Sequence, residues 1–104
     1  LAHYIPEYYD PGWEETERFT EEVLGVTETS NDGHHDDIWV TAMMMVTDPE
    51  QVRYQQRIDA GLASINGVEI TPIDKTIELG RKMQEFRAEF TATAIRKAMQ
   101  SSKQ

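Results

Sequence analysis

The 104 residues are enough for one small domain or for part of a larger one, because domains cluster at about 100 to 150 residues. Hydrophobic residues make up 38% of the chain, below the roughly 45–50% usual for soluble domains (a figure that includes Gly), so we expect a thin core that needs a partner surface. The net charge of −9 is concentrated in residues 1–50, which carry 13 acidic residues, one basic residue and most of the aromatic residues; this excludes a basic, aromatic stripe for nucleic acid.

The longest apolar run, Ile38–Val46, is too short to span a membrane, which takes roughly 18 apolar residues. The sequence has no cysteine, and therefore neither a disulfide nor a thiolate, which is typical of a cytoplasmic protein. It begins abruptly at Leu1 without a charged leader, so we expect a piece of a longer polypeptide. These features predict a soluble, cytoplasmic product without a membrane partner.

The first helix is predicted between Asp10 and Gly25. Residues 1–9 are expected to be extended or irregular, and Pro6 disfavours helix at Ile5. Asp10 is expected to accept hydrogen bonds from the free amides of the first turn, and Pro11 suits the first helical position because it lacks a donor. The helix is expected to run to about Leu24, where Gly25 ends it.

The second helix is predicted to start at Ile38, after a polar loop over residues 27–33. Asp36 and Asp37 precede it as candidate caps. Four apolar residues then recur at i, i+4, i+7 and i+8, namely Ile38, Ala42, Met45 and Val46. A strand is the competing interpretation because residues 38–41 all favour a sheet. We favour the helix. In it, the methionines at 43–45 are expected to fill the core rather than to form a set of ligands, because three consecutive helical residues point in different directions.

The rest of the chain is predicted to contain two more helices and a tight turn. Asp48-Pro49 repeats the capping pattern and predicts a short helix over residues 49–57. Asn66-Gly67 predicts a hairpin turn with very short strands. The longest helix is predicted from Asp74 to about Met99, on the helical spacing of Leu79, Met83, Phe86, Phe90 and Ala94.

The segment Asp32–Asp37 concentrates side chains that can carry chemistry, including His34 and His35. It cannot be a complete metal site, because adjacent residues do not converge on one ion and a site needs three or four ligands. Two interpretations stay open. In one, a histidine oriented by a neighbouring carboxylate moves protons in an acid–base site. In the other, the aspartates cap the helix and the histidines are solvated.

Two other classes of site are absent from the sequence. It has no Gly-x-Ser-x-Gly elbow and no glycine-rich phosphate loop, which excludes a serine hydrolase triad and a P-loop.

Three aromatic residues near the N-terminus, Tyr8, Tyr9 and Trp13, have two interpretations. They form either an exposed aromatic patch for a partner or packing beneath the first helix, and we favour packing.

Two stretches resemble the creatininase (creatinine amidohydrolase) family. Residues 34–45, followed by residues 48–53, resemble the family's late catalytic motif: a His, small or acidic residues, a Thr-Ser-like pair opening an apolar helix, and a Pro-acid-x-Val turn. Residues 76–82 are similar to the final family helix, which carries a Thr or Ala, then Gly and a basic residue. The resemblance implies that residues 1–104 are the C-terminal segment of one such domain.

The resemblance implies an α/β fold, an α/β/α layered domain of which this chain forms the mainly helical C-terminal part. It also implies a metal-dependent hydrolase that opens a cyclic amide or related ring, with zinc or manganese activating a water. The family's metal ligands, a Glu-x-His pair, an Asp and an Asn-Gly-His segment, are expected outside this chain. Creatininase proper has Trp and Glu at the positions where this chain has Asn31 and His34. The difference implies a cyclic substrate other than creatinine, such as an inosose-type cyclic polyol ketone or a lactam.

Residue roles follow from the same resemblance. His35 is implied as the proton-transfer residue, Asp36 or Asp37 as its orienting carboxylate, and His34 and Trp39 as substrate contacts. The implied partners are the N-terminal portion or a companion chain of the enzyme, a small cyclic substrate, and further copies in a hexamer. The rival hypothesis is a small acidic helical interaction module, or a non-catalytic subunit, whose aromatic N-terminal half docks a partner.

Overall fold

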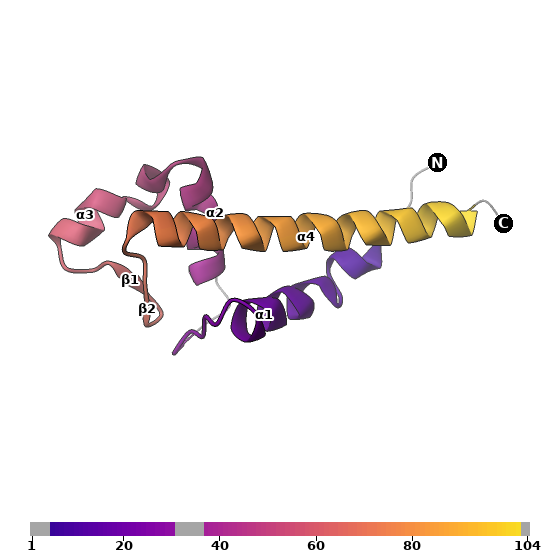
Figure 1. The fold of residues 1–104 in the computed structure, drawn as a ribbon, viewed down its shortest axis with the longest axis horizontal. Helices are drawn as coiled ribbons and strands as arrows, with labels where there is room; N and C mark the ends of the chain where they lie inside the picture. Colours follow the sequence, from indigo (N-terminus) through magenta and orange to yellow (C-terminus); the bar gives the residue numbers. More distant parts are fainter. Residues whose placement is uncertain (1–4, 31–36, 103–104) are drawn as a thin grey trace.

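The computed structural model describes residues 5–30 and 37–102, most of which are helical (Figure 1). In chain order, with η for a 3-10 helix, the elements are η1 (Pro6–Tyr8), α1 (Gly12–Glu22), α2 (Ile38–Thr47), η2 (Pro49–Val52), α3 (Tyr54–Asp59), β1 (Ser64–Ile65), β2 (Val68–Glu69) and α4 (Ile73–Ser102). This confirms a mainly helical segment with one small antiparallel hairpin. Within the described ranges, no helix combines the length and the apolar character needed to cross a membrane.

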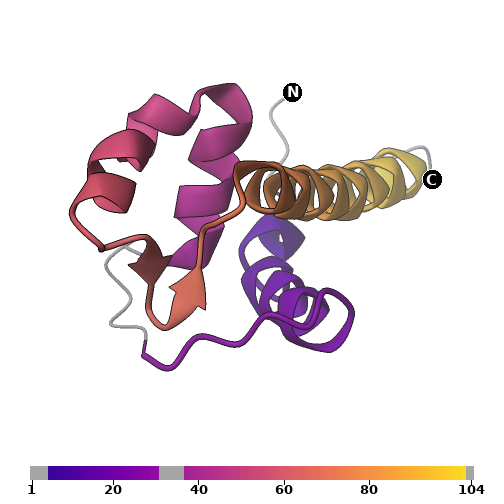
Figure 2. The same cartoon turned by 60° about the vertical axis from the view of Figure 1, so that its left-hand side comes forward.

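The other elements are arranged around α4 (Figure 1). The 30 residues of α4 span about 45 Å, which accounts for most of the molecule's longest dimension of 58 Å. Helices α2 and α3 and the hairpin gather at the N-terminal end of α4, whereas α1 lies along its middle turns. Figure 2 shows that α1 and α2 lie against different sides of α4.

The core lies where α2 meets the first half of α4. Its buried members come from α2, α3, the residue after β2, and α4: Ile38, Trp39, Ala42, Met45, Tyr54, Ile70 and Met83. The helix predicted from Ile38 is therefore confirmed, and the strand interpretation is wrong. Of the three methionines predicted to fill the core, Met45 is fully buried and Met43 packs against the core, but Met44 is 41% exposed, so the prediction is wrong for Met44. Consecutive helical side chains point in different directions, and that of Met44 points toward the surface.

Helix α4 lies close against the backbone of α2 at Gly80. A Cβ atom at this position would overlap the carbonyl oxygen of Ala42, and it would lie 2.7 Å from the carbonyl carbon of Ala42 and 2.8 Å from Cγ2 of Val46. Since glycine has no Cβ, the backbone of α4 can contact the backbone of α2 directly.

The predicted hairpin turn and the predicted long helix are both confirmed. Strands β1 and β2 pair antiparallel, and the φ angles of Asn66 and Gly67 are +51° and +84°, as a two-residue hairpin turn requires. Helix α4 begins at Ile73 and continues past Met99 to Ser102. On its predicted apolar face, Met83 is fully buried.

Three details of the predicted helices are wrong. Residues 6–8 form a 3-10 helix rather than irregular chain, and α1 has Pro11 at its N-cap position with no side-chain cap from Asp10. The reason is that the turn after η1 leads directly into α1, so the carbonyl of Tyr9 accepts the amide hydrogen of Trp13. The helix predicted over residues 49–57 is divided into η2 and α3 by Arg53, whose φ angle of +54° is left-handed.

The buried face of α1 is made of small and polar residues. It comprises Gly12, Thr16 and Thr20. The hydroxyl of Thr16 donates to the carbonyl of Gly12 (2.7 Å), and that of Thr20 donates to the carbonyl of Thr16 (2.8 Å). These hydroxyl groups are satisfied inside the helix, while Phe19 attaches α1 to α4 by stacking on Phe86 with 4.4 Å between ring centroids.

Candidate functional site

The candidate site lies at the start of α2, which follows the segment Asp32–Asp37 in the sequence. Asp37 is the N-cap residue of α2, and its Oδ1 accepts the amide hydrogen of Val40 (2.9 Å). The carbonyl of Asp37 accepts the hydroxyl hydrogen of Thr41 (2.8 Å). The capping role predicted for Asp37 is confirmed, and it fixes the chain two residues after His35.

We expect Asp37→Ala to lower the free energy of unfolding by about 1 kcal/mol, because an amide of the first turn loses its acceptor. Asp37→Ser is the matched control, since its hydroxyl oxygen accepts the same hydrogen bond and should keep the stability close to that of the wild type. Urea denaturation monitored by circular dichroism measures both. Equal losses in the two variants would show that the carboxylate acts through something other than the cap.

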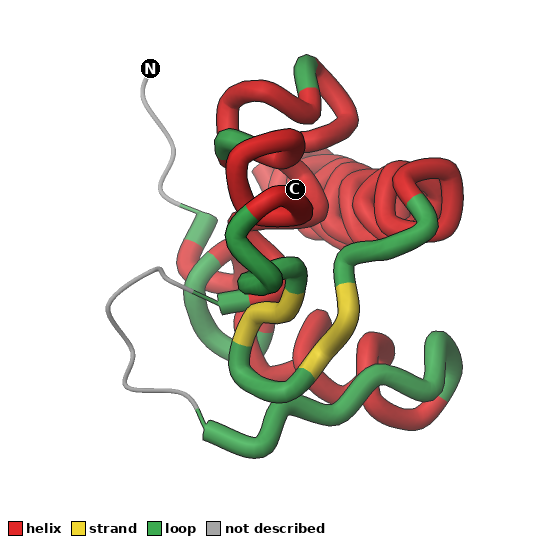
Figure 3. The backbone as a smooth tube through the Cα atoms, turned by 90° about the vertical axis from the view of Figure 1, so that its left-hand side faces the viewer, coloured by secondary structure: helices red, strands yellow, loops and turns green. Residues whose placement is uncertain are grey.

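Glu28 joins the start of α2 to two other segments. Its Oε2 accepts the amide hydrogen of Ile38 (3.0 Å) and an amide hydrogen of the Asn66 side chain (2.6 Å). In Figure 3 the loop after α1 passes beside the hairpin, where the backbone N–H of Thr29 donates to the carbonyl of Asn66 (2.7 Å). Ile38 is the first residue of α2, so its amide has no acceptor within the helix and lies at the positive end of the helix dipole. The carboxylate of Glu28 therefore anchors the start of α2 to the hairpin.

Trp39 faces α1 from the first turn of α2. Its side chain is only 6% exposed, and its Nε1 donates to the hydroxyl of Thr20 (3.1 Å). Its ring stacks on Trp13, with 5.1 Å between centroids and 22° between planes. The structure thus places Trp39 in the core, and the substrate contact expected of it stays a prediction. Trp13 packs on Trp39 while remaining 37% exposed, so it combines packing with surface exposure.

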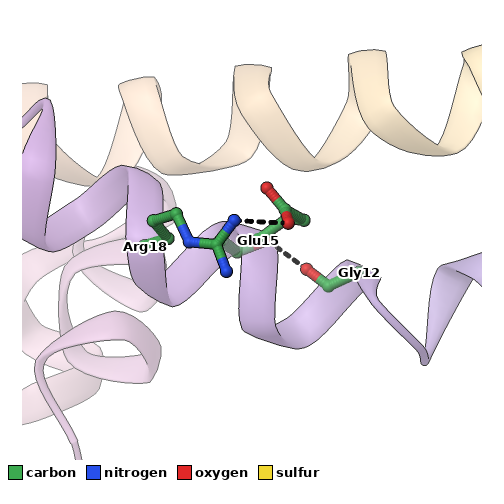
Figure 4. A network of polar contacts seen from close by, with 4 residues as sticks. Gly12, Glu15 and Arg18 are labelled. Atoms are coloured by element: carbon green, nitrogen blue, oxygen red, sulfur yellow. Dashed lines mark hydrogen bonds and ion pairs between the residues drawn. The ribbon is translucent and has the colours of Figure 1, made fainter.

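Acidic side chains surround the start of α2. The pKa of Glu17 is raised above its ordinary value by partial burial and by the negative charges of four further carboxylates, namely Glu21, Asp37, Glu14 and Glu28. Arg18 is the only Lys or Arg in residues 1–50, and it forms an ion pair with Glu15 (2.9 Å) one turn away in the same helix (Figure 4). Figure 4 also shows the carbonyl of Gly12, which accepts the hydroxyl hydrogen of Thr16.

Because its pKa is higher in the folded than in the unfolded chain, Glu17 lowers stability above its folded pKa, and this penalty disappears as the pH falls through that value. We expect Glu17→Gln to raise Tm by about 2 °C near neutral pH and to have no such effect in acid. Glu85→Gln, at an exposed position of α4, is the control and should change Tm little at either pH. An unchanged Tm of Glu17→Gln near neutral pH would contradict the repulsion.

The remaining predicted site residues, His34, His35 and Asp36, lie outside the described residues. Among the residues that are described, no group of three or more His, Asp or Glu is arranged to hold a metal ion. The structure therefore brings Asp37 and Trp39 to the same end of α2 but gives them different neighbours, a helix amide for Asp37 and α1 for Trp39.

Sequence reasoning missed Glu28. Glu28 lies in a polar loop, ten residues before Ile38 and 38 residues before Asn66, which both donate to its carboxylate. No local sequence pattern links these three positions. Comparisons of the chain with protein-family models, with curated proteins and with solved structures found no match.

Proposed function

We propose that this chain is the C-terminal part of a creatininase-like metal-dependent hydrolase and that it supplies the proton-transfer residue, His35, to an active site completed by another polypeptide segment. The anchoring of the start of α2 carries this proposal. Asp37 caps the helix, and Glu28 binds its first amide, so the residue two positions after His35 is fixed to the scaffold. A catalytic side chain needs such support, since small displacements of a reacting group cost much of the rate.

Contact between the two stretches that resemble the family also supports the proposal. One stretch contains α2 and the other contains the first turns of α4, and these helices meet at Gly80. The glycine that the resemblance aligns with the final family helix is therefore the residue that lets α4 lie against α2. In the proposed enzyme, the domain is α/β/α layered and this chain forms part of its helical layers.

The reaction proposed is the opening of a cyclic amide or of an inosose-type cyclic polyol ketone. Zinc or manganese would supply an activated water as the nucleophile. The ligand motifs of the family, a Glu-x-His pair, an Asp and an Asn-Gly-His segment, are assigned to the N-terminal portion or companion chain. On this chain, His35 accepts a proton and returns it to the departing ring atom, and His34 lines the pocket. Because Oδ1 of Asp37 accepts the Val40 amide hydrogen, orienting His35 falls to Asp36 or to the second oxygen of Asp37.

The composition of the protein as isolated from its source tests this proposal. We expect native mass spectrometry to show this chain together with a segment that bears the Glu-x-His, Asp and Asn-Gly-His ligands, and elemental analysis to show zinc or manganese. Removal of the metal by a chelator should abolish ring opening, and its return should restore it. A lone, metal-free monomer would contradict the enzyme assignment.

A second candidate is an interaction module or non-catalytic subunit. The low hydrophobic content favours it, because a chain with 38% hydrophobic residues builds a thin core that a partner surface would extend. The lone monomer that would contradict the enzyme would fit this candidate, which has no need of a metal or of His35.

A further inference from the structure

Arg87 on α4 contacts two aromatic rings through its guanidinium group. Its guanidinium carbon lies 4.6 Å from the centroid of Tyr8 and 4.4 Å from that of Trp13. Cation–π contacts of this kind stabilise the positive charge of the guanidinium. They do not provide acceptors for its N–H groups, which lie in the guanidinium plane.

Both terminal nitrogens of Arg87 are buried without a hydrogen-bond partner among the described residues. A buried, unpaired N–H of a charged group is costly, and groups of this kind are rare in folded proteins. None of the ion pairs found in the described part of the chain involves Arg87. Residues 5–30 and 37–102 therefore supply no acceptor for the terminal N–H groups of this guanidinium.

A groove of about 460 Å³ runs along α4 beside Arg87. Its lining on α4 follows one helix face from Gln84 to Ile95, a length of about 17 Å, and includes the small residues Ala88 and Ala92. Met43 of α2 and Tyr8 of η1 form its other walls. Small residues along a helix allow a second helix to pack closely, and the length of the groove suits about three helical turns.

The charge of the groove limits what can occupy it. Among the described lining residues, Arg87 is charged and the rest are apolar or neutral, with no carboxylate. The molecule as a whole carries a net charge of −9, so a positive groove is a local exception. Tyr8, one of the rings that cover Arg87, is 39% exposed, and a shift of this ring would open the guanidinium to the groove.

We propose that this groove binds an amphipathic helix of a partner polypeptide, with the partner's apolar face on Ala88, Ala92 and Ile95 and one of its carboxylates paired with Arg87. In this pairing, the carboxylate would accept hydrogen bonds from both terminal nitrogens of Arg87 in a charge-assisted, bidentate contact. The inference does not depend on the hydrolase activity, because it concerns binding alone.

A pair of synthetic peptides tests the proposal. One is a helical peptide of about 18 residues with a leucine face and a single central glutamate, and the other carries glutamine in its place. Isothermal titration calorimetry with the whole chain should show the glutamate peptide binding about ten-fold more tightly or better, and added salt should reduce the difference. Equal affinities of the two peptides, or no binding by either, would overturn the proposal.

Two variants assign the effect to the groove. Arg87→Met keeps the length and apolar stem of the side chain, and it should make the two peptides bind equally while the circular dichroism of the chain stays unchanged. If Arg87→Met does not fold, Ala88→Glu, at an exposed helix position, should weaken the glutamate peptide more than the glutamine peptide. An undiminished preference in the folded variant would reject Arg87 as the partner of the carboxylate. Sedimentation equilibrium of the chain alone tests whether a second copy of the chain occupies the groove instead. If the chain forms a dimer that Ala88→Glu dissociates, the groove belongs to the second copy and the proposal is overturned.

Discussion

Gly80→Ala is expected to lower the free energy of unfolding by about 2 to 4 kcal/mol, although alanine is the better helix former by about 1 kcal/mol. The new Cβ would overlap the Ala42 carbonyl oxygen and crowd Cγ2 of Val46. The carbonyl oxygen and carbonyl carbon of Ala42 belong to the backbone of α2, which cannot rotate out of the way as a side chain can. The helices would have to separate, and the core between them includes Met45 and Met83. Thermal and urea denaturation measure the loss.

The reverse exchange at an exposed position of the same helix is the matched control. Ala88→Gly should cost about 1 kcal/mol through helix propensity alone. If Gly80→Ala instead stabilised the protein, the helix propensity of alanine would outweigh the overlap of its Cβ with α2. That result would contradict the close packing of α4 against α2 at this position.

His35→Ala is expected to reduce turnover by the complete assembly at least about 100-fold, which is the usual contribution of a general acid or base. Its metal content should stay that of the wild type, because the proposed ligands belong to the other segment. The measurements are kcat on the ring that the wild-type assembly opens and elemental analysis of the purified variant. Unchanged turnover would refute the role of His35.

His34→Ala separates proton transfer from substrate binding. Because His34 is proposed to line the pocket, its loss should raise KM more than it lowers kcat. Asp37→Ser, which keeps the helix cap, serves as a further control: a large loss of kcat there would assign the orienting carboxylate to Asp37, and a small one would leave that role to Asp36.

The parts of the fold that local chemistry determines were predictable from the sequence. Asp37 caps α2 because its side-chain oxygen reaches an amide three residues away. Asn66 and Gly67 form the turn because both tolerate positive φ. The buried face of α4 follows from apolar residues at helical spacing. Each of these signals acts over a few residues, and each was read correctly.

The interactions that shape the candidate site act over longer distances and were not predictable. Glu28 binds Ile38 and Asn66, and Trp39 stacks on Trp13 from another helix; the sequence does not show which distant residues meet. Arg53 adopts a left-handed conformation without being Gly, Asn or Asp, so no residue preference marks the end of η2. The prediction about Asp10 failed for a related reason, since a neighbouring turn supplied the acceptor that a cap would have supplied.

The threonine face of α1 has a consequence for how the molecule opens. Because the hydroxyls of Thr16 and Thr20 donate to carbonyls of their own helix, separation of α1 from the rest leaves neither of them without an acceptor. Separation breaks the ring stacks of Phe19 and Trp13, the contact of Arg87 with the Trp13 ring, and the bond from Trp39 to Thr20. An 11-residue helix is marginal once detached, so α1 melts when it leaves. Its amides should therefore exchange with solvent through a sub-global opening, at a lower free energy than the amides between α2 and α4.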